Sequence, residues 1–313
     1  PIYKFLKKQL ETNLYFFTGN IDNETKTKTS YLKSGEVLLL DNIRFFKGED
    51  ENDENFAKIL SALGEIYIND AFSCSHRKQA SVHKITKYVK HCYAGPLLKT
   101  EVEAIDLVIK DKKKPVTCII GGSKISTKIN IISNLIQNVE NIVIVGAMAN
   151  NFLKFKNFKV GKSLVEVNSE KIIEGIYSDA KKNDCKIIIP IDCLVSTELE
   201  GKAFEKELTN IKHDEIILDI GAATIKIVTD IIQKSNTVLW NGPAGYFENK
   251  NFANGTYSIA KSISENTINK SLISILGGGD TISAVNKVEK KLTFTHLSTA
   301  GGAFLEYLEG KDL

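Results

Sequence analysis

Residues Gly121–Lys128 read GGSKISTK and directly follow the apolar run Val116–Ile120. Glycine has no Cβ, so two glycines at the end of a strand let the backbone approach a ligand closely. We predict a helix over Lys124–Ile136, which would place Lys124 and Lys128 on one helix face. This pattern predicts a phosphate-binding turn, although an ordinary strand-to-helix turn with solvated lysines has the same local sequence.

Apolar runs and helical patterns continue to alternate after this stretch. Strands are predicted at Val116–Ile120, Asn141–Val145, Lys186–Ile191, Glu215–Ile220, Thr237–Trp240 and Ser271–Leu276, and helices at Lys124–Ile136, Glu170–Lys182 and Ala223–Lys234. Strand, helix and strand at this spacing predict an α/β fold with right-handed crossovers and a parallel sheet. Glycine-rich turns follow several of these strands. A parallel sheet gathers such turns at one edge, where ligands bind.

The first third of the chain predicts a second, smaller α/β region. Helices are predicted at Pro1–Gln9 and Phe56–Leu63, strands at Leu14–Phe17, Val37–Leu40 and Glu65–Asn69, and a surface loop at Ile21–Ser34. The amphipathic segment Gly95–Asp111 ends before Pro115 and reads as one connecting helix. We therefore expect a partial N-terminal domain at 1–94, an interdomain helix at 95–112 and a C-terminal domain at 113–313.

Composition limits the classes of function. The 313 residues are 42% hydrophobic and 25% charged, and a net charge of +3 is too small to favour nucleic acid or a membrane surface as a partner. We expect a cytoplasmic protein, because the sequence contains neither a long apolar span nor a signal-peptide pattern. The five cysteines form no CxxC motif and are expected to be reduced.

Arginine is rare, since the 41 basic residues include only Arg44 and Arg77. Each follows a predicted strand, and the planar guanidinium can bind a phosphate or carboxylate through two hydrogen bonds. Both are therefore candidate ligand-binding residues, with a plain surface position as the alternative.

Common nucleotide motifs do not fit. Gly161–Ser163 reads GKS, but Lys156 stands where a P-loop has glycine, and Ile282 breaks a GxGxxG pattern that starts at Gly277. An NAD-dependent oxidoreductase is therefore only a weak alternative. The stretch Gly277–Thr281 still offers N–H groups to phosphate, a carboxylate to Mg²⁺ and a hydroxyl. Its Asp280 or Thr281 could instead simply cap a helix.

Eight stretches in order resemble the successive sequence blocks of the phosphoglycerate kinase family. They are LLLDNIRF (38–45), INDAFSCSHRKQAS (68–81), GGSKISTKI (121–129), VGAMANNFL (145–153), LDIGAATI (218–225), LWNGPAGYFE (239–248), LGGGDT (276–281) and HLSTAGGAFLEYLEGK (296–311). The resemblance implies two Rossmann-like domains, the first for phosphoglycerate and the second for the nucleotide. It also implies reversible phosphoryl transfer between MgATP and 3-phosphoglycerate, giving ADP and 1,3-bisphosphoglycerate, by a monomer.

The resemblance also implies roles for individual residues. Arg44 and Arg77 would bind the phosphate of 3-phosphoglycerate, Lys124 would stabilise the transferring phosphoryl group, and Lys128 would reach the nucleotide phosphates. Asp280 would hold Mg²⁺, Glu248 would contact the ribose, and Gly121, Gly122 and Ala147 would flank the base. The expected nucleotide-binding set is Gly121, Gly122, Lys128, Ala147, Asn241, Glu248, Gly278, Gly279, Asp280 and Thr281.

The sequence also departs from the family pattern. The family has an Asp-x-Asn motif, an arginine and a His-Leu-Gly-Arg block that do not occur here before Val37, and Ala300 stands where many members have glycine. We therefore expect this 313-residue chain to be feebly active while still binding nucleotide. The alternative is a non-catalytic nucleotide-binding remnant of a kinase.

Overall fold

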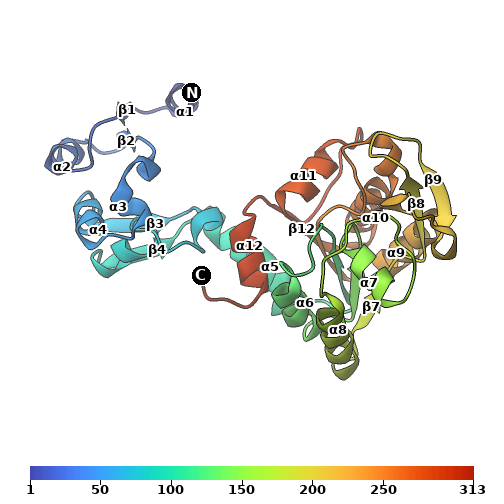
Figure 1. Ribbon diagram of the computed structural model, residues 1–313. Coiled ribbons are helices and arrows are strands. Elements are labelled where there is room, and N and C mark those ends of the chain that lie inside the picture. Colours follow the sequence, from blue (N-terminus) through green and yellow to red (C-terminus); the bar gives the residue numbers. More distant parts are fainter. The chain divides into compact units, whose positions relative to one another are not determined.

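The computed structural model describes all residues, 1–313, and contains two compact units, Pro1–Thr100 and Glu101–Leu313 (Figure 1). Both units combine helices with parallel strand pairs, so the predicted α/β class with parallel sheets is confirmed. None of the helices combines the length and the apolar character needed to cross a bilayer.

The first unit contains two small parallel sheets, one pairing β1 with β2 and the other pairing β3 with β4. Its elements are α1 (Ile2–Gln9), β1 (Leu14–Phe17), α2 (Asn23–Ser30), β2 (Val37–Leu40), η1 (Ile43–Phe45), α3 (Lys47–Asp50), α4 (Glu54–Ser61), β3 (Ile66–Asn69), η2 (Phe72–Cys74), η3 (Lys84–Lys87) and β4 (His91–Ala94). A small apolar core includes Ala57, Leu60 and Ile85.

The prediction of a surface loop at Ile21–Ser34 is wrong, because helix α2 occupies most of this segment. Asp22 caps this helix by accepting a hydrogen bond from the Glu24 N–H at 2.8 Å, and Thr25 completes a capping box. A capped polar helix has no apolar stripe, so hydrophobic periodicity cannot reveal it.

The predicted connecting helix is α5 (Pro96–Ile109), which contains the boundary between the two units. Asp70, directly after β3, accepts hydrogen bonds from the N–H groups of Leu97 at 2.6 Å and Leu98 at 3.1 Å. These bonds satisfy free donors in the first turn of the helix.

The second unit is built around a six-stranded, wholly parallel sheet in the order β13-β12-β11-β5-β6-β7. Its strands are β5 (Val116–Ile120), β6 (Asn141–Ile144), β7 (Lys186–Ile188), β11 (Thr237–Asn241), β12 (Ile273–Gly277) and β13 (His296–Ser298). Its helices are α6 (Ile129–Ile136), α7 (Ala149–Phe155), α8 (Glu170–Lys182), α9 (Ala222–Lys234), α10 (Asn254–Lys270), α11 (Gly279–Asn286) and α12 (Gly302–Leu308).

The helices of this unit contact one another in two groups, α6, α7, α8 and α12 in one and α9, α10 and α11 in the other. Trp240 of β11 is fully buried and packs in one core with Val228 of α9 and Ile259 of α10. Every residue of β5 is buried, as expected for a central strand of a sheet covered on both faces.

Two strand predictions fail in the same region. Lys186–Ile191 was expected to be one strand, but β7 ends at Ile188, before Pro190, which has no N–H to donate. Strand β8 (Asp192–Ser196) starts only three residues after β7, too soon for the crossover that a parallel neighbour requires. It forms a separate antiparallel sheet with β9 (Phe204–Glu207) and β10 (Ile216–Ile220), so β10 is not part of the parallel sheet.

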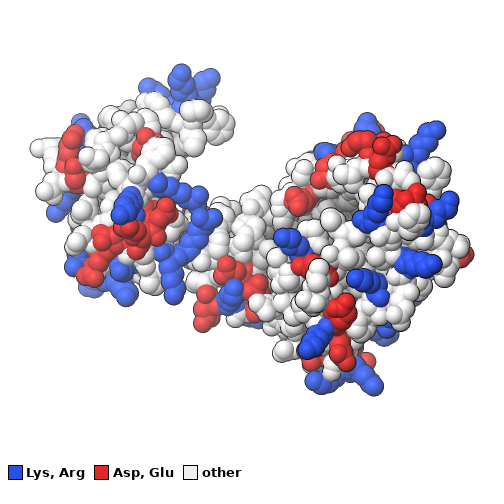
Figure 2. All heavy atoms as spheres, viewed as in Figure 1, with Lys and Arg blue, Asp and Glu red and all other residues white.

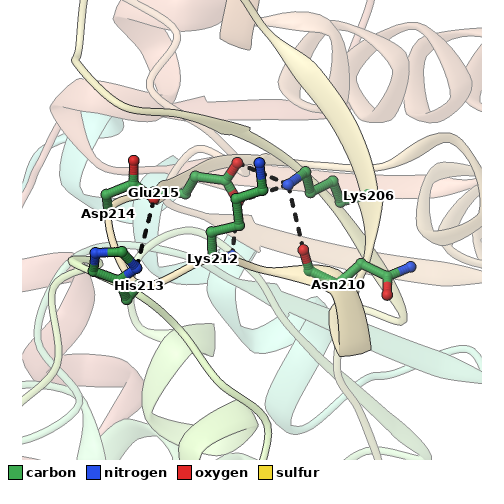
Figure 3. A network of polar contacts seen from close by, with 6 residues as sticks. All are labelled: Lys206, Asn210, Lys212, His213, Asp214 and Glu215. Carbon is green, nitrogen blue, oxygen red and sulfur yellow. Dashed lines mark hydrogen bonds and ion pairs between the residues drawn. The ribbon is translucent and has the colours of Figure 1, made fainter.

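A polar network supports this second sheet (Figure 3). Lys206 of β9 donates to both carboxylate oxygens of Glu215, at 2.7 and 2.9 Å, and the Lys212 N–H donates to the same carboxylate at 2.8 Å. Partial burial raises the pKa of Glu215, but the hydrogen bonds and charges of Lys206 and Lys212 together outweigh this effect. The pKa of Glu215 therefore lies below its usual value. The network, which includes η4 (Leu208–Asn210), fixes the chain directly before β10.

Candidate functional site

Three glycine-containing turns contact one another closely at the carboxyl edge of the parallel sheet. The Gly121 N–H donates to Asn241 O at 2.8 Å, and the Met148 N–H donates to Gly122 O at 2.8 Å. A Cβ at Gly121 would lie 2.3 Å from Pro243 O, closer than any real contact. These turns follow β5, β6 and β11, and they approach one another closely because Gly121 has no side chain.

A cavity of about 510 Å³ opens beside these turns, wholly within the second unit. Four of the predicted nucleotide-binding residues line it, namely Gly122, Ala147, Glu248 and Asp280. Much of the remaining wall is apolar and includes Leu153, Leu164, Leu199, Ile216, Leu218 and Pro243. A largely apolar cavity of this volume with charged groups at its margin suits a small organic ligand with an ionic part.

The two lysines do not share a helix face, and that prediction is wrong. Helix α6 begins only at Ile129, so Lys124 and Lys128 lie in the preceding loop, where Gly122 has a positive φ of 119°. Lys124 is exposed, and its side chain makes no hydrogen bond or ion pair within the chain. The loop conformation separates the two ammonium groups into different environments.

Lys128 is largely buried beside the ends of two strands. Its ammonium donates a hydrogen bond to Asn241 Oδ1, and Asn241 Nδ2 donates to Gly277 O at 2.8 Å. Burial lowers the pKa of Lys128 to about 8, although the nearby charge of Asp280 raises it. Because the desolvated ammonium lacks a close anionic partner, this position favours an anionic ligand.

The stretch Gly278–Thr281 starts helix α11, but neither Asp280 nor Thr281 caps it, so the capping interpretation is wrong. Gly278 is the N-cap, with a positive φ of 97° and no side-chain cap. Thr281 is fully buried, and its hydroxyl accepts from the Gly242 N–H at 2.7 Å and donates to Gly277 O at 2.9 Å. These bonds join the turns after β11 and β12.

Asp280 is exposed, lines the cavity and has no hydrogen-bond partner within the chain. The chain has no cluster of three or more His, Cys, Asp or Glu residues that could hold a metal ion. A single free carboxylate fits Mg²⁺ that is coordinated mainly by phosphate oxygens and water.

The first unit carries the two arginines. Arg44 lies in η1 directly after β2, and Arg77 lies after β3 and η2, both exposed and without a side-chain partner. Buried Glu49 of α3 accepts hydrogen bonds from the Ser81 N–H at 2.8 Å and the Ser81 hydroxyl at 2.6 Å, which ties the Arg77 loop to the segment after Arg44. On the face shown in Figure 2, basic and acidic side chains are interspersed over the second unit.

Two carboxylates of the second unit, Glu166 and Asp219, lie outside the set of site residues predicted from the sequence. Glu166 accepts hydrogen bonds from Ser126, 40 residues earlier, and the sequence gives no local sign of this contact. Asp219 is buried and accepts from the Gly255 N–H at 2.8 Å. Burial raises the pKa of Asp219 to about 7, although hydrogen bonds from Gly255 and Ile220 lower it.

Ala300, which stands where many members of the family have glycine, does not have a positive φ, so its backbone is unstrained.

A parallel α/β sheet with glycine turns, a buried lysine and a free carboxylate at one edge is typical of enzymes that handle nucleotide phosphates. A sequence model described as "Phosphoglycerate kinase" matches residues 1–311. The phosphoglycerate kinase of Wolbachia sp. subsp. Drosophila simulans (strain wRi) is 40% identical over 310 residues, covering 98% of this chain and 78% of the relative. That of Rhizobium meliloti (strain 1021) is 41% identical over 307 residues, covering 97% and 76%.

Solved structures of the same family are also similar to this chain. Phosphoglycerate kinase from Coxiella burnetii matches with a TM-score of 0.91 at 36% identity, covering 100% of this chain and 78% of that one. The enzyme from Pyrococcus horikoshii OT3 matches with a TM-score of 0.81 at 28% identity, covering 100% and 79%. The chain belongs to the phosphoglycerate kinase family, which confirms the resemblance seen in the sequence. The expected kinase class is confirmed, and the oxidoreductase and non-catalytic alternatives are not favoured.

Proposed function

We propose that this chain catalyses reversible phosphoryl transfer between MgATP and 3-phosphoglycerate, with the nucleotide in the cavity of the second unit. The observation that carries this assignment is the largely buried Lys128 ammonium, which is influenced by the charge of the cavity-lining carboxylate of Asp280 but forms no ion pair with it. In this proposal Gly121, Gly122 and Ala147 flank the base, and Glu248 at the cavity wall contacts the ribose. The N–H groups of Gly278 and Gly279 face the phosphates.

Asn241 and Thr281 hold this phosphate region together rather than standing free for a ligand. Their side chains already bond within the chain, Asn241 to Lys128 and Gly277, and Thr281 to Gly242 and Gly277. We assign them to the nucleotide site because they fix the turns that face the phosphates. Asp280 would hold Mg²⁺, which when bound neutralises charge on the phosphate oxygens.

Lys124 and Lys128 have different roles at the phosphates in this proposal. Lys128 binds the nucleotide phosphates from its buried position, and the exposed Lys124 stabilises the moving phosphoryl group. A carboxylate oxygen of 3-phosphoglycerate attacks the γ-phosphorus as the bond to the ADP oxygen breaks, so catalysis consists of positioning and charge neutralisation. Arg44 and Arg77 bind the phosphate of the acceptor through their free guanidinium groups.

The remaining assignments belong to the same proposal. Residues 1–94 form the phosphoglycerate domain, 95–112 the connecting helix and 113–313 the nucleotide domain, in a cytoplasmic monomer. The test is 3-phosphoglycerate-dependent formation of ADP from MgATP. Lys124→Met should lower kcat at least about 100-fold, the scale for removing a preorganised charge partner, while MgADP affinity stays within twofold. Wild-type kcat in Lys124→Met would refute the assigned role.

A further inference from the structure

The loop Gly122–Lys128 carries Lys124 without the support of a helix. Helix α6 begins at Ile129, and the Lys124 side chain has no partner that fixes it. The position of its ammonium therefore depends on what holds the backbone on either side. A shift of about 1 Å in a catalytic group can cost 100-fold in rate, so these attachments matter for function.

The loop is attached at two points. At its start, Gly122 O accepts a hydrogen bond from the Met148 N–H at 2.8 Å. At its far side, the Glu166 carboxylate accepts from the Ser126 N–H at 3.0 Å and from the Ser126 hydroxyl at 2.5 Å. Lys124 lies between these attachments, two residues from each.

Both attachments lead to the same short segment at the start of α7. The Glu166 N–H donates to Asn151 Oδ1 at 2.7 Å, and Asn151 Nδ2 donates to Met148 O at 3.1 Å. Asn151 is only 1% exposed, so water competes little for these bonds. The hydrogen bonds thus close a ring from Gly122 through Met148, Asn151 and Glu166 to Ser126.

The charge of Glu166 also suits this position. Burial raises the pKa of Glu166, but the Ser126 hydrogen bonds and the nearby charge of Lys124 outweigh this and lower it, so the carboxylate is ionised at neutral pH. No ion pair forms between Glu166 and Lys124, which leaves the lysine ammonium available to a phosphate. The carboxylate can hold the loop without occupying the group that the loop presents.

We propose that Glu166 is a positioning residue that fixes the Lys124 loop through Ser126 and is itself fixed by Asn151. This inference rests on the proposed role of Lys124 in phosphoryl transfer. It predicts that loss of the Glu166–Ser126 contact lowers kcat about tenfold to 100-fold and leaves the KM for MgATP within twofold, because Gly122 and Lys128 at the ends of the loop keep their own hydrogen bonds to Met148 and Asn241.

The contact is tested by Glu166→Ala, Ser126→Ala and the double variant. Because both residues act through one contact, the double variant should be no slower than Glu166→Ala alone, whereas independent effects would multiply. Glu166→Asp keeps the carboxylate and should recover part of the rate. Glu170→Gln, at an exposed position in the first turn of α8, is the matched control and should keep wild-type turnover.

Hydrogen exchange on the full chain supplies a second readout that needs no turnover. Amides of 122–128 should exchange faster in Glu166→Ala, with unchanged protection of β11. Wild-type exchange in this loop, or an unchanged kcat in Glu166→Ala while Lys124→Met is impaired, would overturn this inference alone. Wild-type turnover in Lys124→Met would instead overturn the proposed function, so the two failures are distinguishable.

Discussion

The Lys128 ammonium donates a hydrogen bond to Asn241 Oδ1, joining the loop after β5 to the end of β11. Since burial lowers the pKa of Lys128 to about 8, the free site is only partly protonated at pH 8. An anionic phosphate favours the charged form and raises that pKa, so nucleotide binding should take up a proton.

The first prediction concerns the pH dependence of MgADP affinity. Binding should weaken as the pH rises through 8, approaching tenfold per pH unit above it, because the lysine must then be reprotonated. Calorimetry at pH 8 in buffers with different ionisation heats measures the proton uptake. Lys128→Arg stays charged and should lose this dependence, and an unchanged proton count in that variant would contradict the assignment.

The second prediction concerns Asp219 and stability. Its pKa of about 7 in the folded state lies above the usual value of 3.8 for this side chain, so the folded chain binds more protons between these pH values. The stability that Asp219 contributes is fully present below about pH 4 and is lost as the pH rises through 7. From pH 5 to 8 the wild type should lose about 2 to 3 kcal/mol relative to Asp219→Asn. Denaturant unfolding of both proteins measures this difference, and parallel curves would contradict it.

The third prediction concerns the close approach of the glycine turns. Gly121→Ala should destabilise the second unit by about 3 kcal/mol, because the new Cβ would collide with Pro243 O and displace the turn. Gly175→Ala is the control, since Gly175 lies exposed within α8 with nothing near its missing Cβ. That change should stabilise the helix by about 0.5 to 1 kcal/mol. Thermal unfolding decides between these opposite signs.

The fourth prediction concerns the acceptor phosphate. Arg77→Gln should raise the KM for 3-phosphoglycerate at least about tenfold, because a charge-assisted pair of hydrogen bonds is lost. MgADP affinity should not change. The neighbouring Lys78 is also exposed, so Lys78→Gln is a matched control for the loss of one positive charge. An equal rise in KM for both variants would indicate a general electrostatic effect of positive charge rather than a specific contact of Arg77 with the phosphate.

Sequence patterns predicted the elements whose signals are local. The apolar runs of β2, β5 and β11 appeared with nearly correct bounds, and the turns that follow them were expected where the structure has them. Helix α2 was missed because a capping box at Asp22, rather than an apolar stripe, stabilises it. The antiparallel partner of β10 was missed because strand direction depends on chain segments that are distant in sequence.

In the candidate site, too, features with a local sequence signal could be predicted, and features that depend on contacts between distant segments could not. Lys124, Lys128 and Asp280 were predicted as site residues from motifs, whereas the Glu166–Ser126 contact joins positions 40 residues apart and has no sequence signature. The different surroundings of the two lysines also depend on tertiary structure. A helix was expected from Lys124 onward, but positive φ at Gly122 and the late start of α6 produce a loop in which Lys128, and not Lys124, is largely buried.

The central claim is that the cavity of the second unit holds the nucleotide with its phosphates at Lys128. Titration calorimetry with MgADP tests it most directly on wild type, Lys128→Ala and the control Lys171→Ala, which changes an exposed lysine of α8. The account predicts one site per chain, at least about tenfold weaker binding in Lys128→Ala, and wild-type affinity in Lys171→Ala. No binding by the wild type, or equal affinity in Lys128→Ala, would contradict it.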